Sequence, residues 1–315
     1  MRWKWVLLGA VVLVAGAVLC WMGLSSGVLA DDPTSSRARI QEHLTPMLQV
    51  LAPLHKELGP PQPGDWLSEH EEAGQTFEQY LDCDPITPDE VRRVLYLLPI
   101  GQFSDKQREV VTLTADYLER YFGLPVKFLP DIPLSDIPES AQRRHPSWGM
   151  RQLLSTYFLR DVLVAALPDD AAALLGLTAV DLWPGEGWSF VFGQASLRNR
   201  VGIWSIYRNG DPDASDADFR LCLLRTIKTA THELGHMFSM RHCTKYECNM
   251  CGANNREESD SGPLALCPEC MAKVCWASLF DPVKRYRQLA DFCQQHELKT
   301  EGAFFEQLLA RLEME

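Results

Sequence analysis

The chain has 315 residues and a formal net charge of -12, and its 46% of hydrophobic and 23% of charged residues are ordinary for a globular protein. A chain of this length can bury one large core or two small ones. Because nucleic-acid binding needs a basic surface and the sequence has no basic run, the acidic balance argues against a nucleic-acid partner.

An uncharged apolar run extends from Trp5 to Leu24 and is preceded by basic residues. Its 20 residues are enough to cross a bilayer core as a helix. Small residues at Val28 and Ala30 resemble a signal-peptidase site, so cleavage is the alternative to a retained anchor. We therefore predict a signal anchor or signal peptide over residues 1–30. The protein would be a single-pass membrane protein with the rest of the chain outside the cytoplasm, or would be secreted after cleavage.

An amphipathic helix is predicted over Thr34 to Leu58, where apolar residues recur at helical spacing. Pro46 and Pro53 lie inside it, which predicts a kinked or split helix. A proline-rich linker follows, and the next domain is predicted to start near residue 61. Residues 31–60 would then form a helical stalk and linker, or the helix would pack on that domain.

Strands and helices are predicted in the next part of the chain. Val91–Ile100 contains a buried apolar run typical of a strand, and Ser104 can cap a helix that ends at Gly123. With a short strand at Val126–Leu129, this order predicts a parallel pair joined by a right-handed crossover. The later elements predicted from local pattern are a helix over Met150–Leu167, strands over Ala171–Leu177, Trp188–Gly193 and Val201–Tyr207, and C-terminal helices near Asp281–Gln295 and Gly302–Glu315.

The two aromatic-rich strands, Trp188–Gly193 and Val201–Tyr207, are close enough in sequence for Arg198 and Asn199 to connect them as a hairpin. A strand of this kind beside a site would offer an edge for an extended peptide, although burial in a sheet core explains the same residues equally well. Ser215 is placed to cap the helix that follows.

That helix carries the main candidate for chemistry. His232 and His236 are four residues apart, so both rings face one side of a helix and can bind one ion. Glu233 lies beside the first ring, where a carboxylate can accept a proton from water on the metal. His242 supplies a third ligand if the helix stops near Ser239 and the chain turns back. Three histidines leave the fourth position of a tetrahedral zinc open, as a catalytic site requires.

The motif His232-Glu233-x-x-His236-x-x-x-x-x-His242-Cys243, followed by Cys248-x-Met250 and Cys267-x-x-Cys270, resembles the archaemetzincin family of zinc metallopeptidases. The resemblance runs roughly from Pro61 to Gln295. It implies an α+β, metzincin-like catalytic domain with a mixed twisted sheet, an active-site helix and a zinc-bound C-terminal subdomain, preceded here by the N-terminal apolar helix. Met250 would form the methionine turn under the metal.

The chain departs from the family at one position of this motif. The family usually has glycine where this chain has Ser239, because the turn there requires positive φ. Serine adopts that conformation at a cost of about 1 kcal/mol, so we expect strain there rather than loss of function.

Six of the ten cysteines lie between Cys243 and Cys275, a clustering that favours a metal over scattered disulfides. Spacing alone predicts a zinc ribbon of Cys248, Cys251, Cys267 and Cys270. The resemblance instead implies Cys243 in place of Cys251, and this is the assignment we prefer. Disulfides are the remaining alternative, in keeping with the predicted export.

We therefore predict a metallopeptidase that acts on peptides or proteins and binds two Zn²⁺ ions per chain, one catalytic and one structural. If the N-terminal helix is not cleaved, it would attach the protein to the membrane. The predicted domains are the catalytic domain at residues 61–295, which includes the cysteine cluster, and a helical tail at 296–315. The alternatives are a membrane-tethered zinc-binding module with impaired or no activity, favoured only by Ser239, and a nucleic-acid-binding zinc ribbon, disfavoured by the acidic charge.

Overall fold

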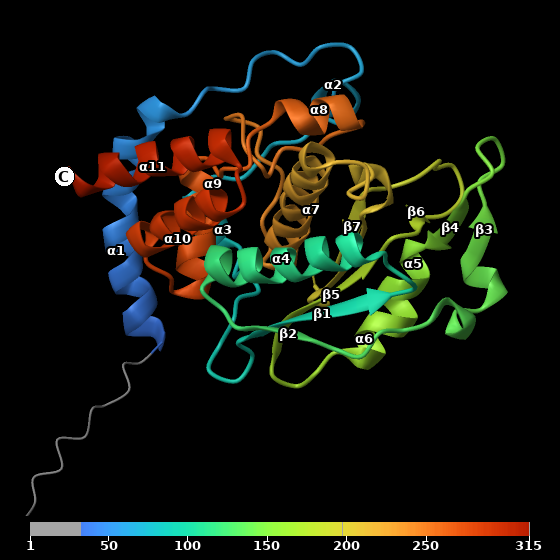
Figure 1. Cartoon of the computed structure of the whole chain (residues 1–315). Helices are drawn as coiled ribbons and strands as arrows, with labels where there is room; N and C mark the ends of the chain where they lie inside the picture. The colour runs from blue at the N-terminus through green and yellow to red at the C-terminus, as the bar shows by residue number, and fades with distance from the viewer. Residues whose placement is uncertain (1–32, 197, 315) are drawn as a thin grey trace, which may run out of the picture. The chain divides into compact units, whose positions relative to one another are not determined.

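A five-stranded mixed sheet lies at the centre of the part of the chain that the structure describes (Figure 1). The structure is a computed structural model that describes residues 33–196 and 198–314. The strand order is β2-β1-β5-β8-β7, with parallel pairing throughout except for β7, which lies at one edge and runs antiparallel to β8. The strands are β1 (Val94–Ile100), β2 (Val126–Phe128), β5 (Ala171–Thr178), β7 (Gly193–Ala195) and β8 (Val201–Ser205). The protein is therefore a mixed α/β protein.

A smaller sheet of three strands adjoins this one, in the order β3-β4-β6. Its strands are β3 (Gln142–Arg144), β4 (Arg151–Leu154) and β6 (Asp181–Trp183), with β4 antiparallel to β3 and parallel to β6.

Both faces of the large sheet are covered, which explains why β1 is apolar along its whole length. Leu95 and Leu97 pack into one hydrophobic cluster with residues of α4 (Asp105–Phe122) and α7 (Asp216–Met237). Tyr96 and Leu98 point the other way and pack with Phe158 in a second cluster. Alternate residues of a strand face opposite sides, so burial on both sides requires a continuous apolar run. The predicted strand, crossover helix and parallel neighbour are confirmed.

The ends of α4 also follow the local sequence signals. The Ser104 hydroxyl accepts a hydrogen bond from the Gln107 amide, and the Gln107 side chain accepts one from the Ser104 amide, which makes a capping box. Gly123 ends the helix with φ of +64°, a conformation that glycine adopts without steric cost.

The N- and C-terminal helices of the described chain pack together. Helix α1 (Pro33–Leu51) continues through Pro46 and gives way to a 3₁₀ turn at Ala52–Leu54, so the predicted split is confirmed at Pro53. Helix α1 contacts α9 (Pro268–Ser278) and α11 (Lys299–Glu313), and α11 contacts α10 (Pro282–Gln295) (Figure 1). The predicted domain boundaries at 60 and 295 stay predictions.

Two predicted elements were wrong in type. Residues 151–154 of the helix predicted over Met150–Leu167 form β4, because they pair with both β3 and β6; helical turns begin at Ser155 and run to Ala166. Most of the strand predicted over Trp188–Gly193 is irregular. Only Val191 bridges to Leu182 before β7 begins at Gly193, and the neighbouring aromatic rings contact arginines instead of extending the sheet.

The predicted membrane localisation is also wrong. None of the helices formed by residues 33–196 and 198–314 combines the length and apolar character needed to cross a bilayer. The longest of them, α7, carries charged side chains along its length. The apolar run from Trp5 to Leu24, on which that prediction rested, lies outside the described residues.

Candidate metal centre

Helix α7 positions the first two histidines and the glutamate. Ser215 caps its start, as predicted, by accepting a hydrogen bond from the Asp218 amide. The helix ends at Met237, and Ser239 then adopts φ of +66°, which turns the chain back towards the helix. The left-handed turn predicted at Ser239 is confirmed, and it brings His242 beside the other two rings.

The three imidazole rings are each held by the nitrogen that faces away from the others. His232 Nδ1 lies 2.8 Å from the Asn249 carbonyl, and His236 Nδ1 lies 2.8 Å from the Met240 carbonyl. His242 Nδ1 lies 2.9 and 3.0 Å from the two carboxylate oxygens of Glu72. Since carbonyls and carboxylates accept hydrogen bonds, each Nδ1 carries a proton, and in the neutral form of each ring Nε2 then keeps a lone pair.

These lone pairs fit a metal ion. The Nε2 atoms of His232 and His236 are 3.0 Å apart, and neither has a proton to share with the other. Ligand atoms of all three histidines lie within 4.8 Å of one another. A cation bound to all three nitrogens removes this repulsion, and neutral imidazole is a preferred ligand of Zn²⁺. Burial, followed by the neighbouring histidines, holds the pKa of His232 well below its usual value, and burial lowers that of His236 to about 4, so both rings are neutral.

Glu233 lies on the same helix, buried, with its carboxylate against β7. A methyl group placed on Gly193 would lie 2.6 Å from Glu233 Oε1, so only glycine lets the strand approach this closely. Burial raises the pKa of Glu233 to about 8. A metal cation bound by the adjacent histidines would favour the ionised carboxylate.

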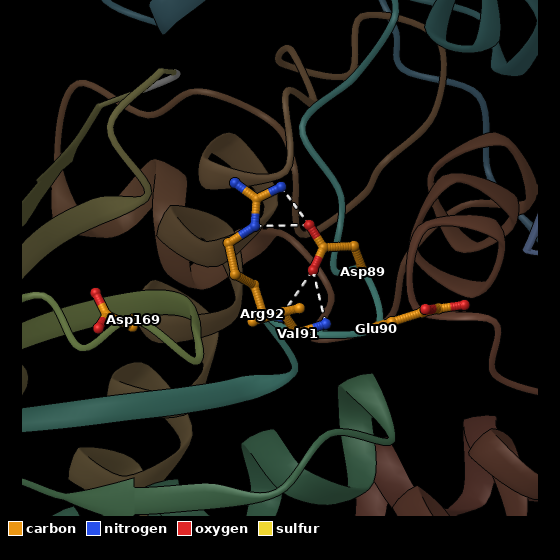
Figure 2. A pocket seen from close by; sticks show the side chains of 5 residues that line it. All are labelled: Asp89, Glu90, Val91, Arg92 and Asp169. Carbon is orange, nitrogen blue, oxygen red and sulfur yellow. Dashed lines mark hydrogen bonds and ion pairs between the residues drawn. The ribbon is translucent and has the colours of Figure 1, made fainter.

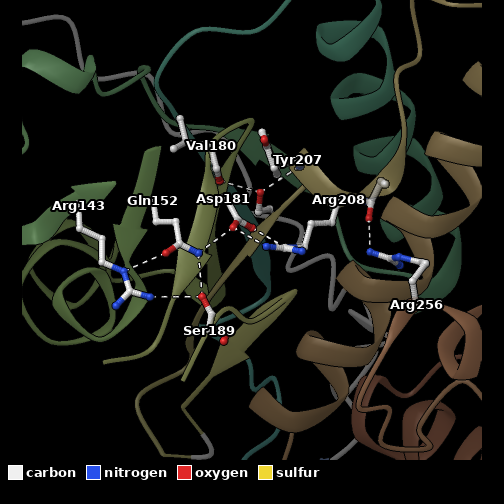
Figure 3. Close-up of polar contacts among 10 residues, drawn as sticks. Arg143, Gln152, Val180, Asp181, Ser189, Tyr207, Arg208 and Arg256 are labelled. Atoms are coloured by element: carbon white, nitrogen blue, oxygen red, sulfur yellow. Dashed lines mark hydrogen bonds and ion pairs between the residues drawn. The ribbon is translucent and has the colours of Figure 1, made fainter. Parts of the chain in front are cut away.

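A buried polar network fixes the irregular segment that leads into β7 (Figure 3). The Asp181 carboxylate accepts hydrogen bonds from Arg208 at 2.7 and 2.8 Å and from Gln152 Nε2 at 2.7 Å. The same Gln152 nitrogen donates to the Ser189 carbonyl at 2.9 Å, and Arg143 donates to that carbonyl at 3.3 Å. Because Asp181 is fully buried and its carboxylate is satisfied in this way, the network ties the backbone at Ser189, four residues before Gly193, to the smaller sheet.

Met250 lies under the metal-binding segment, where the methionine turn was expected. Its side chain is buried, and its sulfur would lie 2.6 Å from a methyl group on Gly235, so it touches the helix backbone between the two histidines. Asn249, the residue before it, donates to Thr231 Oγ1 at 2.8 Å. This bond fixes the Asn249 carbonyl that holds His232.

The structure brings together the four cysteines of the family-based assignment: Cys243, Cys248, Cys267 and Cys270. All four are buried, and their sulfurs lie within 4.8 Å of one another. The Cys248 sulfur accepts hydrogen bonds from the Cys267 amide at 3.2 Å and the Met250 amide at 3.5 Å. Burial raises the pKa of this thiol well above its usual value when no metal is bound, so a cation is needed to hold it as a thiolate. Cys251 is outside this group and donates to the Tyr246 carbonyl at 3.3 Å. All cysteines within residues 33–196 and 198–314 are free thiols.

Sequence reasoning missed the segment that holds His242. Glu72 lies in a loop without helical or strand pattern, 170 residues before the histidine it contacts. A local signal was present next to it: Thr76 and Gln79 form a capping box at the start of α3 (Phe77–Asp82). That signal predicts the helix but not its neighbour in space.

A separate pocket lies before β1 and β5, lined by residues 89–92 and Asp169 (Figure 2). Its Asp89 carboxylate accepts a hydrogen bond from Arg92 Nε at 2.6 Å, and Arg92 lowers the pKa of Asp89 to about 2. The pocket contains none of the predicted metal ligands, so we assign it no function.

Comparison with known proteins decides the family. A model described as peptidase family M54 matches residues 167–275. The chain is 35% identical to Archaemetzincin-2 from Homo sapiens, over 76% of this chain and 75% of the human protein. The chain belongs to the archaemetzincin family. An archaemetzincin from Pyrococcus furiosus is 28% identical, over 58% of this chain and 93% of that protein.

Solved archaemetzincin structures also match. The protein from Archaeoglobus fulgidus, crystallised with malonate, is 30% identical with a TM-score of 0.45, over 57% of this chain and 99% of that chain. The protein from Methanopyrus kandleri is 29% identical with a TM-score of 0.48, over 59% and 96%.

As an archaemetzincin, the protein is a zinc metallopeptidase, and the predicted family and enzyme class are confirmed. The substrates of a peptidase are peptides or proteins. The histidine and cysteine groups are each suited to zinc.

Proposed function

We propose that this archaemetzincin hydrolyses peptide bonds at a zinc ion held by His232, His236 and His242, with Glu233 as the general base. The proposal rests on the three Nε2 atoms, which lie close together. In each ring a hydrogen-bond acceptor at Nδ1 keeps a proton on that nitrogen and leaves Nε2 to bind the metal. Three such nitrogens gathered at one point match the ligand set of a zinc site that keeps one position open.

The roles of the side chains follow from their positions. His232, His236 and His242 would hold the zinc, which would supply Lewis-acid chemistry towards the peptide carbonyl and a water molecule. Glu233, adjacent to His232 on the helix, accepts the proton of the attacking water and passes it to the leaving amine nitrogen. Its burial keeps bulk water from competing for that proton.

The substrate would bind as an extended chain along β7. This strand is the edge of the large sheet, and of the described strands only β8 pairs with it. An extended peptide can add to such an edge through backbone hydrogen bonds. The close approach of Gly193 to the Glu233 carboxylate supports this, because a peptide bound along β7 would pass in front of Glu233.

We assign a second, structural zinc to Cys243, Cys248, Cys267 and Cys270. Four thiolates fill a tetrahedral shell and leave no open position. Cys243 follows His242 directly, so this second ion would fix the backbone that carries the third histidine. Cys251 is expected to stay a thiol.

Cleavage of a mixed peptide library by the full chain tests the function. We expect hydrolysis by the zinc-loaded protein, loss of hydrolysis after treatment with a chelator, and recovery when zinc is added back. Hydrolysis that persists after elemental analysis shows complete removal of zinc would contradict the proposal, as would a zinc-loaded protein that cleaves no peptide.

A further inference from the structure

The turn that delivers His242 is enclosed by a segment from the N-terminal part of the chain, which we call the clamp segment (residues 72–86). The Tyr80 hydroxyl donates to the Phe238 carbonyl at 2.8 Å, and both groups are buried. The Ile86 amide donates to the Ser239 hydroxyl at 3.0 Å. Two points of the clamp segment therefore hold the turn where its backbone is left-handed.

Gln75 holds the turn from a third point. Its side-chain nitrogen donates to the Ser239 carbonyl at 3.4 Å, and its side-chain oxygen accepts from the Arg241 amide at 3.1 Å. The Gln75 carbonyl in turn accepts a hydrogen bond from Lys273, a buried residue of α9. The clamp segment is therefore fixed to the body of the protein as well as to the turn.

Glu72 completes the enclosure at the histidine itself. Both of its carboxylate oxygens lie within hydrogen-bond distance of His242 Nδ1, at 2.9 and 3.0 Å. Trp66 packs edge-on against the same ring, with centroids 5.3 Å apart. The Glu72 carboxylate thus fixes the tautomer of the His242 ring, and the two contacts together fix its orientation.

We propose that Glu72 is a positioning residue for the catalytic zinc: its carboxylate holds the proton on His242 Nδ1, so that Nε2 faces the ion as a stronger ligand. The inference rests on the proposed zinc site and adds a residue to it. The match to peptidase family M54 begins at residue 167, so this part of the site comes from outside the matched region. Carboxylates that orient a metal-binding histidine typically change metal affinity by about 10- to 100-fold.

The neighbouring residue provides a matched control. Glu71 is exposed and adjacent in sequence, so Glu71→Ala removes the same charge from the same loop without touching His242. Glu72→Ala removes the acceptor, and Glu72→Gln keeps a neutral one that can still hold the Nδ1 proton.

The experiment is a titration of the metal-free full chain with Co²⁺, in the wild type and these three variants. Co²⁺ bound by thiolates gives intense sulfur-to-metal absorption that a histidine site lacks, so the two sites are followed separately. We expect Glu72→Ala to weaken binding at the histidine site by about 10- to 100-fold. Glu72→Gln should fall between Glu72→Ala and the wild type, and Glu71→Ala should match the wild type. The affinity of the thiolate site should be the same in all four.

Equal affinity of Glu72→Ala and Glu71→Ala for Co²⁺ at the histidine site would overturn the inference alone. A comparable loss of affinity at the thiolate site would also overturn it, because Glu72 would then act on the fold. A wild-type protein with no histidine-site binding would instead overturn the proposed function.

Discussion

Ser239 offers a sharp test of how the metal-binding turn is held. Its φ of +66° costs a serine about 1 kcal/mol relative to glycine, so the backbone alone predicts that Ser239→Gly stabilises the protein. The structure adds a contact with the opposite effect, because the hydroxyl accepts a hydrogen bond from the Ile86 amide at 3.0 Å. Removing it leaves a partly buried donor without its partner, at a cost of about 1–2 kcal/mol.

Together, the strain at Ser239 and the lost hydrogen bond predict that Ser239→Gly destabilises the protein, the opposite of what the backbone angle alone predicts. Glycine also gains about 0.5–1 kcal/mol of conformational freedom in the unfolded chain, which offsets most of the relieved strain. We therefore expect Ser239→Gly to lower the free energy of unfolding by about 1 kcal/mol, and Ser239→Ala, which keeps the strain, to lower it by about 1–2 kcal/mol.

Denaturant unfolding of the zinc-loaded chain measures both variants. Ser135→Ala, which alters an exposed serine, is the control and should stay within about 0.5 kcal/mol of the wild type. A Ser239→Gly protein more stable than the wild type would refute the reasoning, since strain would then outweigh the hydroxyl contact. An unchanged Ser239→Ala protein would show that this contact contributes nothing.

Three further predictions concern the two metal sites. Cys267→Ser and Cys243→Ser should each lose one of two zinc ions by elemental analysis and several kcal/mol of stability, whereas Cys251→Ser should keep both ions; loss of an ion in Cys251→Ser but not in Cys243→Ser would restore the assignment made from spacing. Without metal, Glu233 has a pKa of about 8 in the folded chain against an ordinary 4.5, so the wild type should lose up to about 5 kcal/mol of stability as pH rises from 4.5 to 8. The stability of Glu233→Gln should not fall in this way, and the same dependence of stability on pH in both proteins would refute the raised pKa of Glu233. Gly193→Ala should displace the Glu233 carboxylate and lower kcat with zinc retained, whereas Gly59→Ala, where no atom lies within 4 Å, should be neutral; an unchanged kcat for Gly193→Ala would contradict the contact.

The elements that the sequence predicted correctly are those whose signals are local. β1 was recognisable from its apolar run, and α4 from Ser104 and Gly123 at its ends, because caps and burial act over a few residues. The metal motif on α7 is local as well, since helix geometry alone brings His232 and His236 together.

The errors arose where the conformation depends on distant partners. The strand predicted at Trp188–Gly193 has strand-like composition, but its aromatic rings are held by Arg208 and Arg256 from elsewhere in the chain. Residues 151–154 have a helix-compatible pattern and became a strand through pairing on both sides. Tertiary contacts of this kind override local propensity.

Glu72 could not be assigned from sequence for the same reason. One acidic residue in an irregular loop carries no spacing relation to a histidine that follows it by 170 positions. Only the fold, which ties Gln75 to α9 through Lys273, shows that this loop reaches the metal centre.

The role of Glu233 as the base, rather than as a ligand or a folding residue, is the central claim, and one variant tests it directly. Zinc content and peptide hydrolysis should be measured on the same preparations of the wild type and Glu233→Gln. Because Glu233 is adjacent to the ligands but is not one of the three histidines, we expect both proteins to bind two zinc ions. Hydrolysis should fall by at least about 100-fold in the variant, the scale of a lost general base. Retained hydrolysis in the variant, or loss of zinc in step with loss of hydrolysis, would contradict the account.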